Sequence, residues 1–146
     1  LLLAGGFLYL MEVSTVRQVA ALCWRWRGNL PEVLLVTSRE TKRWIIPKGW
    51  PMADRKDHAA AKREAFEEAG VDGEIGKEPI GQYSYEKVGA DDNRPILVTI
   101  YPLQVTKLLS AWPEKKERKR EWFVAADAAQ RVAEPGLKAI LRNFRG

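Results

Sequence analysis

Three glutamates, Glu64, Glu67 and Glu68, stand within five positions of each other in the stretch REAFEEAG. Spacings of three and four place their carboxylates on one side of a helix. Each like-charged pair four apart costs about 0.2–0.5 kcal/mol, and acidic groups near a helix C-terminus also oppose the helix dipole. Such a cluster is either a solvated surface stripe or a set of oxygen ligands for a hard divalent cation such as Mg²⁺ or Mn²⁺.

The helix that carries these glutamates is predicted over residues 57–69, because DHAAAKREAFEEA is rich in alanine and charged residues. Asp57 is the predicted N-cap, and Gly70 is predicted to end the helix. Short apolar runs predict strands at residues 18–24, 32–38 and 43–47 upstream of the helix.

Downstream of the helix, residues 80–88 and 95–105 are predicted to form a strand pair around the loop GADDNR, with Pro102 at an edge or a bulge. A short strand at residues 121–124 and two helical segments at residues 125–133 and 135–144 complete the pattern. The absence of repeats and linkers in these 146 residues indicates a single mixed α/β domain.

The domain is assigned to residues 11–146, and residues 1–10 are interpreted as an apolar extension, with Met11 a plausible native start. The ten residues LLLAGGFLYL are too short to span a bilayer, so we expect no membrane association. The single cysteine, Cys23, excludes a disulfide framework and favours a reducing, cytoplasmic location.

The net charge of +5 favours an anionic ligand, and interleaved acidic residues make a small molecule a better candidate than nucleic acid. Cationic side chains near predicted strand ends suit phosphate oxygens, and neutral donors accompany them. The candidate substrate-binding residues are Arg17, Gln18, Ser38, Arg39, Lys48, Gly49 and Arg118. The run EKKERKRE, which contains Arg118, is equally well interpreted as a solvated loop.

A longer motif surrounds the glutamates. Residues 49–71 read GWPMADRKDHAAAKREAFEEAGV, in which Arg63-Glu64 follows Gly49 by fourteen residues and Gly70-Val71 closes the segment. This pattern resembles the Nudix box, the defining motif of the Nudix hydrolases. One position departs from the family pattern, because Arg55 stands where the box has a glutamate, and this substitution leaves the number of bound metal ions open.

The resemblance extends to VLLVTSRETKRWIIPKGW and ERKREWFVAADA, which are similar to the diphosphoinositol polyphosphate phosphohydrolase branch of that family. It covers the chain from about residue 17 to the C-terminus. That branch has a run of glycines after the proline, whereas here Lys48 and Trp50 flank Gly49.

The resemblance implies a Nudix fold, which is an α/β/α sandwich with a mixed β-sheet. It also implies metal-dependent hydrolysis of a diphosphate bond in a substrate such as a diphosphoinositol polyphosphate or a diadenosine polyphosphate. In the family picture Glu64 and Glu68 are metal ligands, Glu67 contributes to the metal site and accepts a proton, and Arg63 orients a carboxylate. The spacing alone does not assign the base, because three adjacent carboxylates titrate together.

A second hypothesis is a non-catalytic module that binds a nucleotide, a polyphosphate or RNA, and Arg55 is the residue that supports it. The retained glutamates oppose this hypothesis, because without a metal they would repel an anion.

Overall fold

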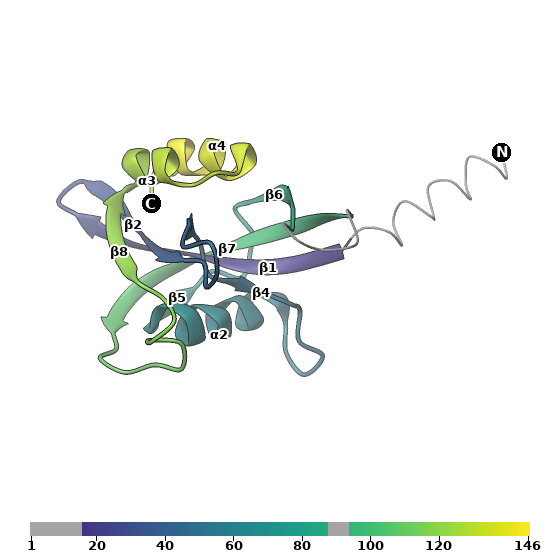
Figure 1. Cartoon of the computed structure of the whole chain (residues 1–146). Helices are drawn as coiled ribbons and strands as arrows, with labels where there is room; N and C mark the ends of the chain where they lie inside the picture. The colour runs from purple at the N-terminus through teal and green to yellow at the C-terminus, as the bar shows by residue number, and fades with distance from the viewer. Residues whose placement is uncertain (1–15, 88–93) are drawn as a thin grey trace, which may run out of the picture.

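The computed structural model describes residues 16–87 and 94–146 of the chain. It contains a mixed eight-stranded sheet in which β1 and β7 are parallel and the other paired strands are antiparallel. Helix α2 covers one face, and α3 and α4 cover the other (Figure 1). The strands are β1 (Val16–Arg27), β2 (Leu30–Thr37), β3 (Trp44–Ile45), β4 (Lys48–Gly49), β5 (Val71–Ile75), β6 (Gly81–Glu86), β7 (Pro95–Leu108) and β8 (Arg120–Val124); the helices are α2 (Asp57–Ala69), α3 (Ala125–Arg131) and α4 (Pro135–Asn143). The predicted α/β/α sandwich is confirmed.

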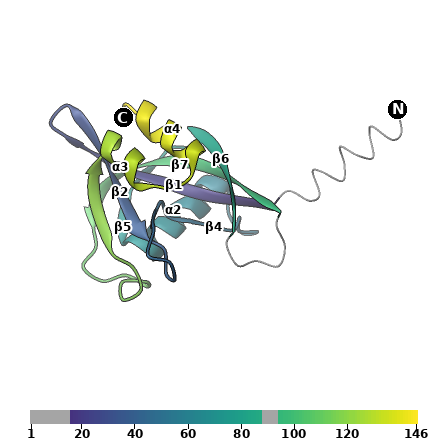
Figure 2. The same ribbon diagram turned by 45° about the horizontal axis from the view of Figure 1, so that its top comes forward.

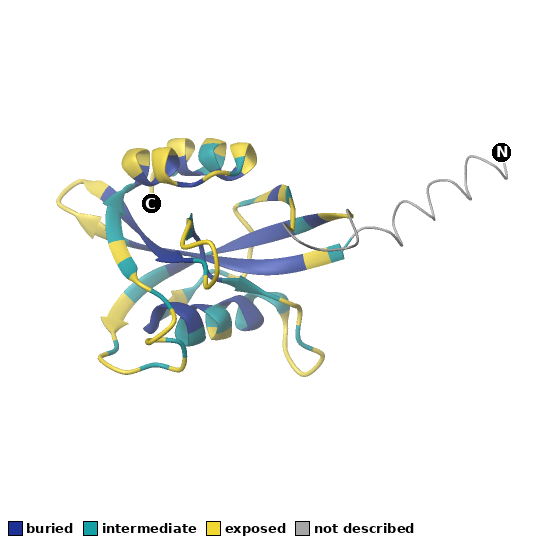
Figure 3. Cartoon of the chain, viewed as in Figure 1, coloured by how far each residue is buried: buried dark blue, intermediate teal, exposed yellow. Residues whose placement is uncertain are grey.

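Strand β1 contributes to the cores on both faces of the sheet, because successive side chains of a strand point to opposite faces. Val19, Ala21 and Cys23 pack in the core beneath α2. Their neighbours Ala20 and Leu22 pack in the core beneath α3 and α4. The strand is therefore buried on both sides, as the dark central band of Figure 3 shows.

The sheet forks next to β1. β2 pairs with β1 only as far as Val33, opposite Trp24. On its other edge β2 pairs with β8 from Glu32 to Val36, and its end pairs with β3 at Val36 and Thr37. The two-residue strand β4 then takes the place beside β1, with Gly49 opposite Val19. Turning the molecule brings this region and the segment before β8 into view (Figure 2). The fork lies next to the helix that carries the three glutamates, since α2 packs against β1, β2 and β4.

Helix α2 begins one residue earlier than the predicted cap implies. Lys56 is the N-cap and forms no side-chain capping bond, whereas Asp57 lies in the first turn. Its carboxylate is 3.3 Å from the Arg17 guanidinium, and this ion pair explains why an acidic residue stands there. At the other end Gly70 adopts a left-handed conformation, φ 65°, as predicted for the residue that ends the helix.

The segment between β7 and β8 closes the C-terminal end of α2. The Nε1 of Trp112 donates to the carbonyl of Glu68, and the amide of Glu114 donates to that of Glu67. The Arg120 guanidinium donates to the carbonyls of Ala69 and Gly70. The exposed carbonyls of a helix end are thus satisfied by one segment of chain.

The expectation that Pro102 lies at an edge or bulge is wrong, because β7 is an inner strand between β1 and the pair β5 and β6. Pro102 lies where the antiparallel partner changes: Ile100 pairs with β6 and Leu103 with β5. Its carbonyl accepts from the amide of Gly76, so the position without an N–H faces the β5–β6 connection.

Of the predicted GADDNR loop, only Arg94 falls within the described residues. Across the described ranges, no helix combines the length and apolar character needed to cross a bilayer.

Candidate functional site

The site begins with a close contact between Gly49 and Glu64. A β-carbon at position 49 would collide with the carboxyl group of Glu64. Glycine at this position therefore leaves the space in which the Glu64 carboxyl lies directly against the β4 backbone. The spacing of fourteen residues between the glycine and Arg63 in the sequence corresponds to this contact between strand and helix.

Glu68 is the most deeply placed of the three glutamates, with 5% of its surface exposed. Its carboxyl lies beside that of Glu64, close enough for the two groups to share a proton. Burial raises the pKa of Glu68 to about 8, and the nearby charge of Glu64 adds to the rise, while Arg118 opposes it. Burial likewise raises the pKa of Glu64. Two neighbouring buried carboxylates repel each other when both are ionised. A bound cation removes this repulsion, so the pair is suited to bind one.

Arg118 is the nearest cationic group to Glu68, with Nη2 3.7 Å from Oε1. It does not reach hydrogen-bonding distance of that oxygen, because Glu114 accepts from its Nε and the Thr37 carbonyl accepts from its Nη1. Glu68 Oε1 is consequently buried without a hydrogen-bond partner among the described residues. A buried carboxylate oxygen without a partner is costly unless a ligand satisfies it.

Glu67 pairs with Arg63 and lies near enough to Glu64 for its charge to raise the pKa of that carboxyl. Arg63 Nε donates to Glu67 Oε1 at 2.9 Å, four residues along the helix. Within the described ranges, no three acidic, histidine or cysteine side chains are gathered in a preformed metal cluster. The paired carboxyls of Glu64 and Glu68, the partnerless oxygen and the close approach at Gly49 nevertheless fit a hard divalent cation, because each supplies or positions a free oxygen donor.

The predicted substrate-binding residues fall into three places. Arg17 pairs with Asp57 beside the start of α2, and Gln18 is buried and accepts a 2.7 Å hydrogen bond from the Tyr85 hydroxyl. Ser38 accepts from the amide of Arg43 and so shapes the β2–β3 turn.

Arg39 is 61% exposed in that turn and lies 4.0 Å from Glu117. Arg118 is largely buried beside Glu68 and is a wall of the site, not a free surface cation.

Lys48 lies in β4 immediately before the contact glycine. Its Nζ is 5.2 Å from the centre of the Tyr85 ring, and within the described part of the chain no carboxylate is within ion-pair distance. Burial lowers the pKa of Lys48, while the charges of Glu68 and Glu134 oppose this effect. Among the described residues, this ammonium is therefore a buried cation without an ion-pair partner.

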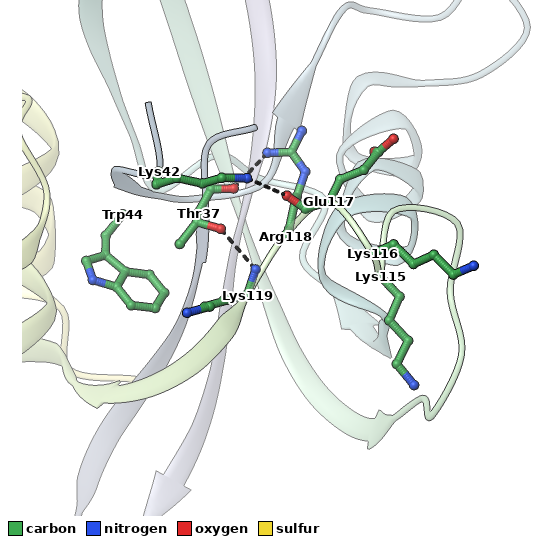
Figure 4. A pocket seen from close by; sticks show the side chains of 8 residues that line it. All are labelled: Thr37, Lys42, Trp44, Lys115, Lys116, Glu117, Arg118 and Lys119. Carbon is green, nitrogen blue, oxygen red and sulfur yellow. Dashed lines mark hydrogen bonds between the residues drawn. The ribbon is translucent and has the colours of Figure 1, made fainter. Parts of the chain in front are cut away.

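Arg118 also lines a basic pocket of about 480 Å³, and it is the one lining residue among the predicted substrate-binding residues. Figure 4 shows Trp44 and Lys119 on one side of Arg118, and Lys115 and Lys116 on the other. Lys42 enters from the β2–β3 turn with φ 55°, a strained conformation for a non-glycine residue. The lining residues are Thr37, Lys42, Trp44, Lys115, Lys116, Glu117, Arg118 and Lys119. The charged run EKKERKRE was the available signal, and the structure shows that part of it lines a cavity.

Arg55, the departure from the box, lies on the outer side of α2. It is 3.5 Å from Asp54 and lines a hollow of about 630 Å³ together with Arg63 and Phe66. The substituted position thus contributes to a different surface from the one that Glu64 and Glu68 share with Gly49.

Two features define the class of protein. One is a mixed sheet between helices, and the other is the acidic helix α2, whose Glu64 lies against Gly49 of β4. The sequence profile of the NUDIX domain matches residues 16–144. The chain therefore belongs to the NUDIX domain family, the family of Nudix hydrolases.

Among curated proteins, the chain is 35% identical over 114 residues to diphosphoinositol polyphosphate phosphohydrolase 3-beta of Bos taurus, an alignment that covers 77% of this chain and 66% of that protein. It is 36% identical over 114 residues to the 3-alpha protein of Homo sapiens, with the same coverage. The chain thus spans slightly less than two thirds of the length of these relatives.

Solved structures confirm the fold. A binary complex of a C. elegans Ap4A hydrolase superimposes with a TM-score of 0.67 at 21% identity, covering 87% of this chain and 93% of that one. The MutT protein from Methanosarcina mazei Go1 gives a TM-score of 0.67 at 18% identity, with 89% and 92% coverage.

Proposed function

We propose that this protein hydrolyses a diphosphate bond in a polyphosphorylated small molecule, with Mg²⁺ or Mn²⁺ as cofactor. The observation that carries the proposal is the pair formed by Glu64 and Glu68, held against Gly49 with one buried oxygen unpartnered. Family membership and the 35% identical diphosphoinositol polyphosphate phosphohydrolase support the reaction class. A diphosphoinositol polyphosphate and a diadenosine polyphosphate are the two substrate types considered.

Glu64 and Glu68 would hold the metal ion, and Glu67 would complete the ligand set and accept the proton of the attacking water. Glu67 is the suitable base because it is the more accessible carboxylate, and the Arg63 hydrogen bond holds it in one orientation. A bound divalent ion supplies charge neutralisation at the diphosphate and a lower pKa for water.

The cationic residues would bind the phosphate groups. Arg118 lies 3.7 Å from Glu68, the charge of Glu68 acts on Lys48, and Arg39 lies 4.0 Å from Glu117, which lines the basic pocket. Arg17 and Gln18 would contribute from the start of β1. The buried free thiol of Cys23 suits the cytoplasmic location that we also propose.

Three single variants test the proposal: Glu64→Gln, Glu67→Gln and Glu68→Gln. Removing the general base Glu67 is expected to lower kcat by about 10²- to 10⁴-fold, while Glu64→Gln and Glu68→Gln should raise the metal concentration needed for half-maximal turnover. The measurement is phosphate or nucleotide release with Mg²⁺, Mn²⁺ or EDTA. Glu74→Gln, on an exposed position of β5, is the matched control.

Turnover by Glu67→Gln and Glu68→Gln at the wild-type rate under saturating Mg²⁺ would show that the site is wrong. Binding of polyphosphates by the wild type without any metal-dependent turnover would replace the enzyme with a binding module.

A further inference from the structure

The hollow beside Arg55 lies on a different side of α2 from the paired glutamates. Each residue turns an α-helix by about 100°, so residues two apart lie on nearly opposite sides of it. Lys62 and Phe66, which line the hollow, therefore lie opposite Glu64 and Glu68. Arg55, the outer side of α2, three residues of β5 and a residue after β7 form the walls and the floor. We call this cavity the α2–β5 hollow.

The floor of the α2–β5 hollow is apolar. Phe66, Ile75 and Leu109 are each half-buried there, and Val71 is buried. The volume of about 630 Å³ lies within the range of about 300–1,000 Å³ that is typical of small-molecule sites. Partly exposed apolar side chains are stabilised when a ligand removes them from water. The hollow is therefore suited to the apolar body of a small molecule.

Cationic side chains outnumber acidic ones around this floor. Arg55, Lys62 and Arg63 line the hollow, whereas Asp72 is the single carboxylate among its described lining residues. Asp72 lies 3.4 Å from the Lys62 ammonium, and Arg55 lies 3.5 Å from Asp54 outside the hollow. Positive charge thus remains in excess on the walls, and an anionic group on the ligand would complement it.

Arg63 connects the α2–β5 hollow to the proposed diphosphate site. Its Nε donates to Glu67 Oε1 at 2.9 Å, and its guanidinium carbon lies 4.9 Å from the centre of the Phe66 ring. Its two Nη groups donate no hydrogen bond to another described residue. An anionic group at the edge of the apolar floor could accept from these nitrogens, which belong to the same guanidinium that orients Glu67.

We propose that the α2–β5 hollow is a second ligand site, which binds a small organic anion with a single carboxylate, sulfonate or phosphate group on an aromatic or aliphatic body. The anionic group pairs with Arg63 and Lys62, and the apolar body covers Phe66 and its neighbours. A polyphosphate fits this site less well, because it has no apolar surface to place against the floor.

Ligand binding in the hollow is coupled to Glu67, since the ligand and Glu67 share the Arg63 guanidinium. An anion that accepts from Arg63 weakens the interaction of Arg63 with Glu67, and by linkage Glu67 weakens the binding of the anion equally. This coupling can be measured by binding alone. The inference thus goes beyond the proposed function and does not depend on turnover.

The test uses two dyes that share an aromatic body and differ in charge: anilinonaphthalene sulfonate and the uncharged phenylnaphthylamine. Fluorescence titration measures the Kd of each dye for the wild type, Lys62→Ala and Asp72→Asn. Lys62→Ala should weaken sulfonate binding about twofold to fivefold, the range for a partly exposed ion pair. Asp72→Asn, which keeps the acceptor for the Gly73 amide, should tighten it by a similar factor. The uncharged dye should bind all three proteins alike.

Glu67→Gln tests the coupling through Arg63. It should also tighten sulfonate binding, because a neutral amide competes less strongly than a carboxylate for the guanidinium. Lys87→Ala and Glu40→Gln, at exposed positions outside the hollow, are matched controls for the charge changes and should leave both affinities unchanged. Thermal melting checks that each variant folds.

Sulfonate affinity that is unchanged in Lys62→Ala, Asp72→Asn or Glu67→Gln would overturn the inference, as would equal effects on the two dyes or equal effects of the control variants. A dimer in sedimentation experiments that Lys62→Ala abolishes would also overturn it, because the occupant would then be a second copy of the chain. The expected dye results in a protein that hydrolyses no diphosphate would support the inference and refute the proposed function alone.

Discussion

Glu68 shows how the local repulsion evident in the sequence is resolved. Its carboxyl lies beside that of Glu64, and Arg118 approaches it to 3.7 Å. Because burial raises the pKa of both carboxyls, we expect the metal-free protein to keep a proton on this pair, and a divalent cation would take the place of that proton. The cluster of glutamates near the C-terminus of α2, which is unfavourable for the helix itself, is thus explained by the site that the glutamates form.

The raised pKa of Glu68 predicts how the stability of the metal-free protein depends on pH. The folded state holds a proton on this carboxyl up to about pH 8, whereas an unfolded glutamate loses it near 4.5. The folded state therefore binds more protons in this window, and the free energy of unfolding should fall as the pH rises from 4.5 to about 8.

The slope that Glu68 adds should not exceed about 1.4 kcal/mol per pH unit, the value for one proton. Urea unfolding in EDTA at several pH values, compared between wild type and Glu68→Gln, isolates this contribution. Identical pH profiles for the two proteins would contradict the assignment.

Helix α2 depends on the segment between β7 and β8 for its C-terminal end. Arg120 lies over the Trp112 ring at 3.9 Å and donates to three carbonyl groups, those of Ala69, Gly70 and Leu109. A cation here also opposes the negative end of the helix dipole, which the glutamates would otherwise strengthen. The basic segment thus stabilises the helix that carries the acidic site.

Replacing Arg120 with alanine should therefore lower the free energy of unfolding by about 1–3 kcal/mol, because buried carbonyl groups lose their donor. The expected result is a lower urea midpoint with an unchanged slope. Lys119→Ala is the matched control, since the Lys119 side chain is exposed and donates no hydrogen bond within the described ranges. Equal midpoints for wild type and Arg120→Ala would show that the helix end is satisfied in another way.

Local pattern predicted the helix of the site but not its surroundings. Alanine content and the closing glycine located α2, because helix propensity and left-handed termination are local properties. The N-cap was misplaced, since Asp57 is engaged by Arg17, forty residues away in sequence. Strand β4 was missed because two residues give no periodicity, and they form a strand only by pairing with β1.

The part of the site that lies within one sequence motif could be predicted. Glu64, Glu67 and Glu68 share one helix, so spacing alone groups them. The surroundings of the glutamates come from distant segments, and no sequence spacing indicates that Lys48 of β4 lies over the ring of Tyr85 in β6. Long-range pairing of β7 with β1 and β6 brings these segments together.

At the scale of the whole molecule, two cores share one sheet, and Cys23 lies in the core beneath α2. The residue is fully buried, and burial, with a smaller contribution from Glu68, raises the pKa of its thiol well above the usual range. No thiolate is available for reaction while the sheet is intact.

Cys23 should accordingly react with a thiol reagent such as dithionitrobenzoate only when the molecule unfolds. The expected labelling rate in native buffer is far below that of a free thiol and rises to the free-thiol rate in urea above the unfolding midpoint. Stopped-flow absorbance measures both rates. Rapid labelling under native conditions would show that β1 opens independently of the rest of the sheet.

The two-sided burial of β1 also restricts how the length of this chain can change. Inserting or deleting one residue between Val19 and Trp24 would move every later side chain of the strand to the opposite core, exchanging small residues for large ones. The turn at Gly28 has no such constraint, because open space surrounds it. Variation in length among homologous sequences should therefore be concentrated at that turn and be absent from the strand before it.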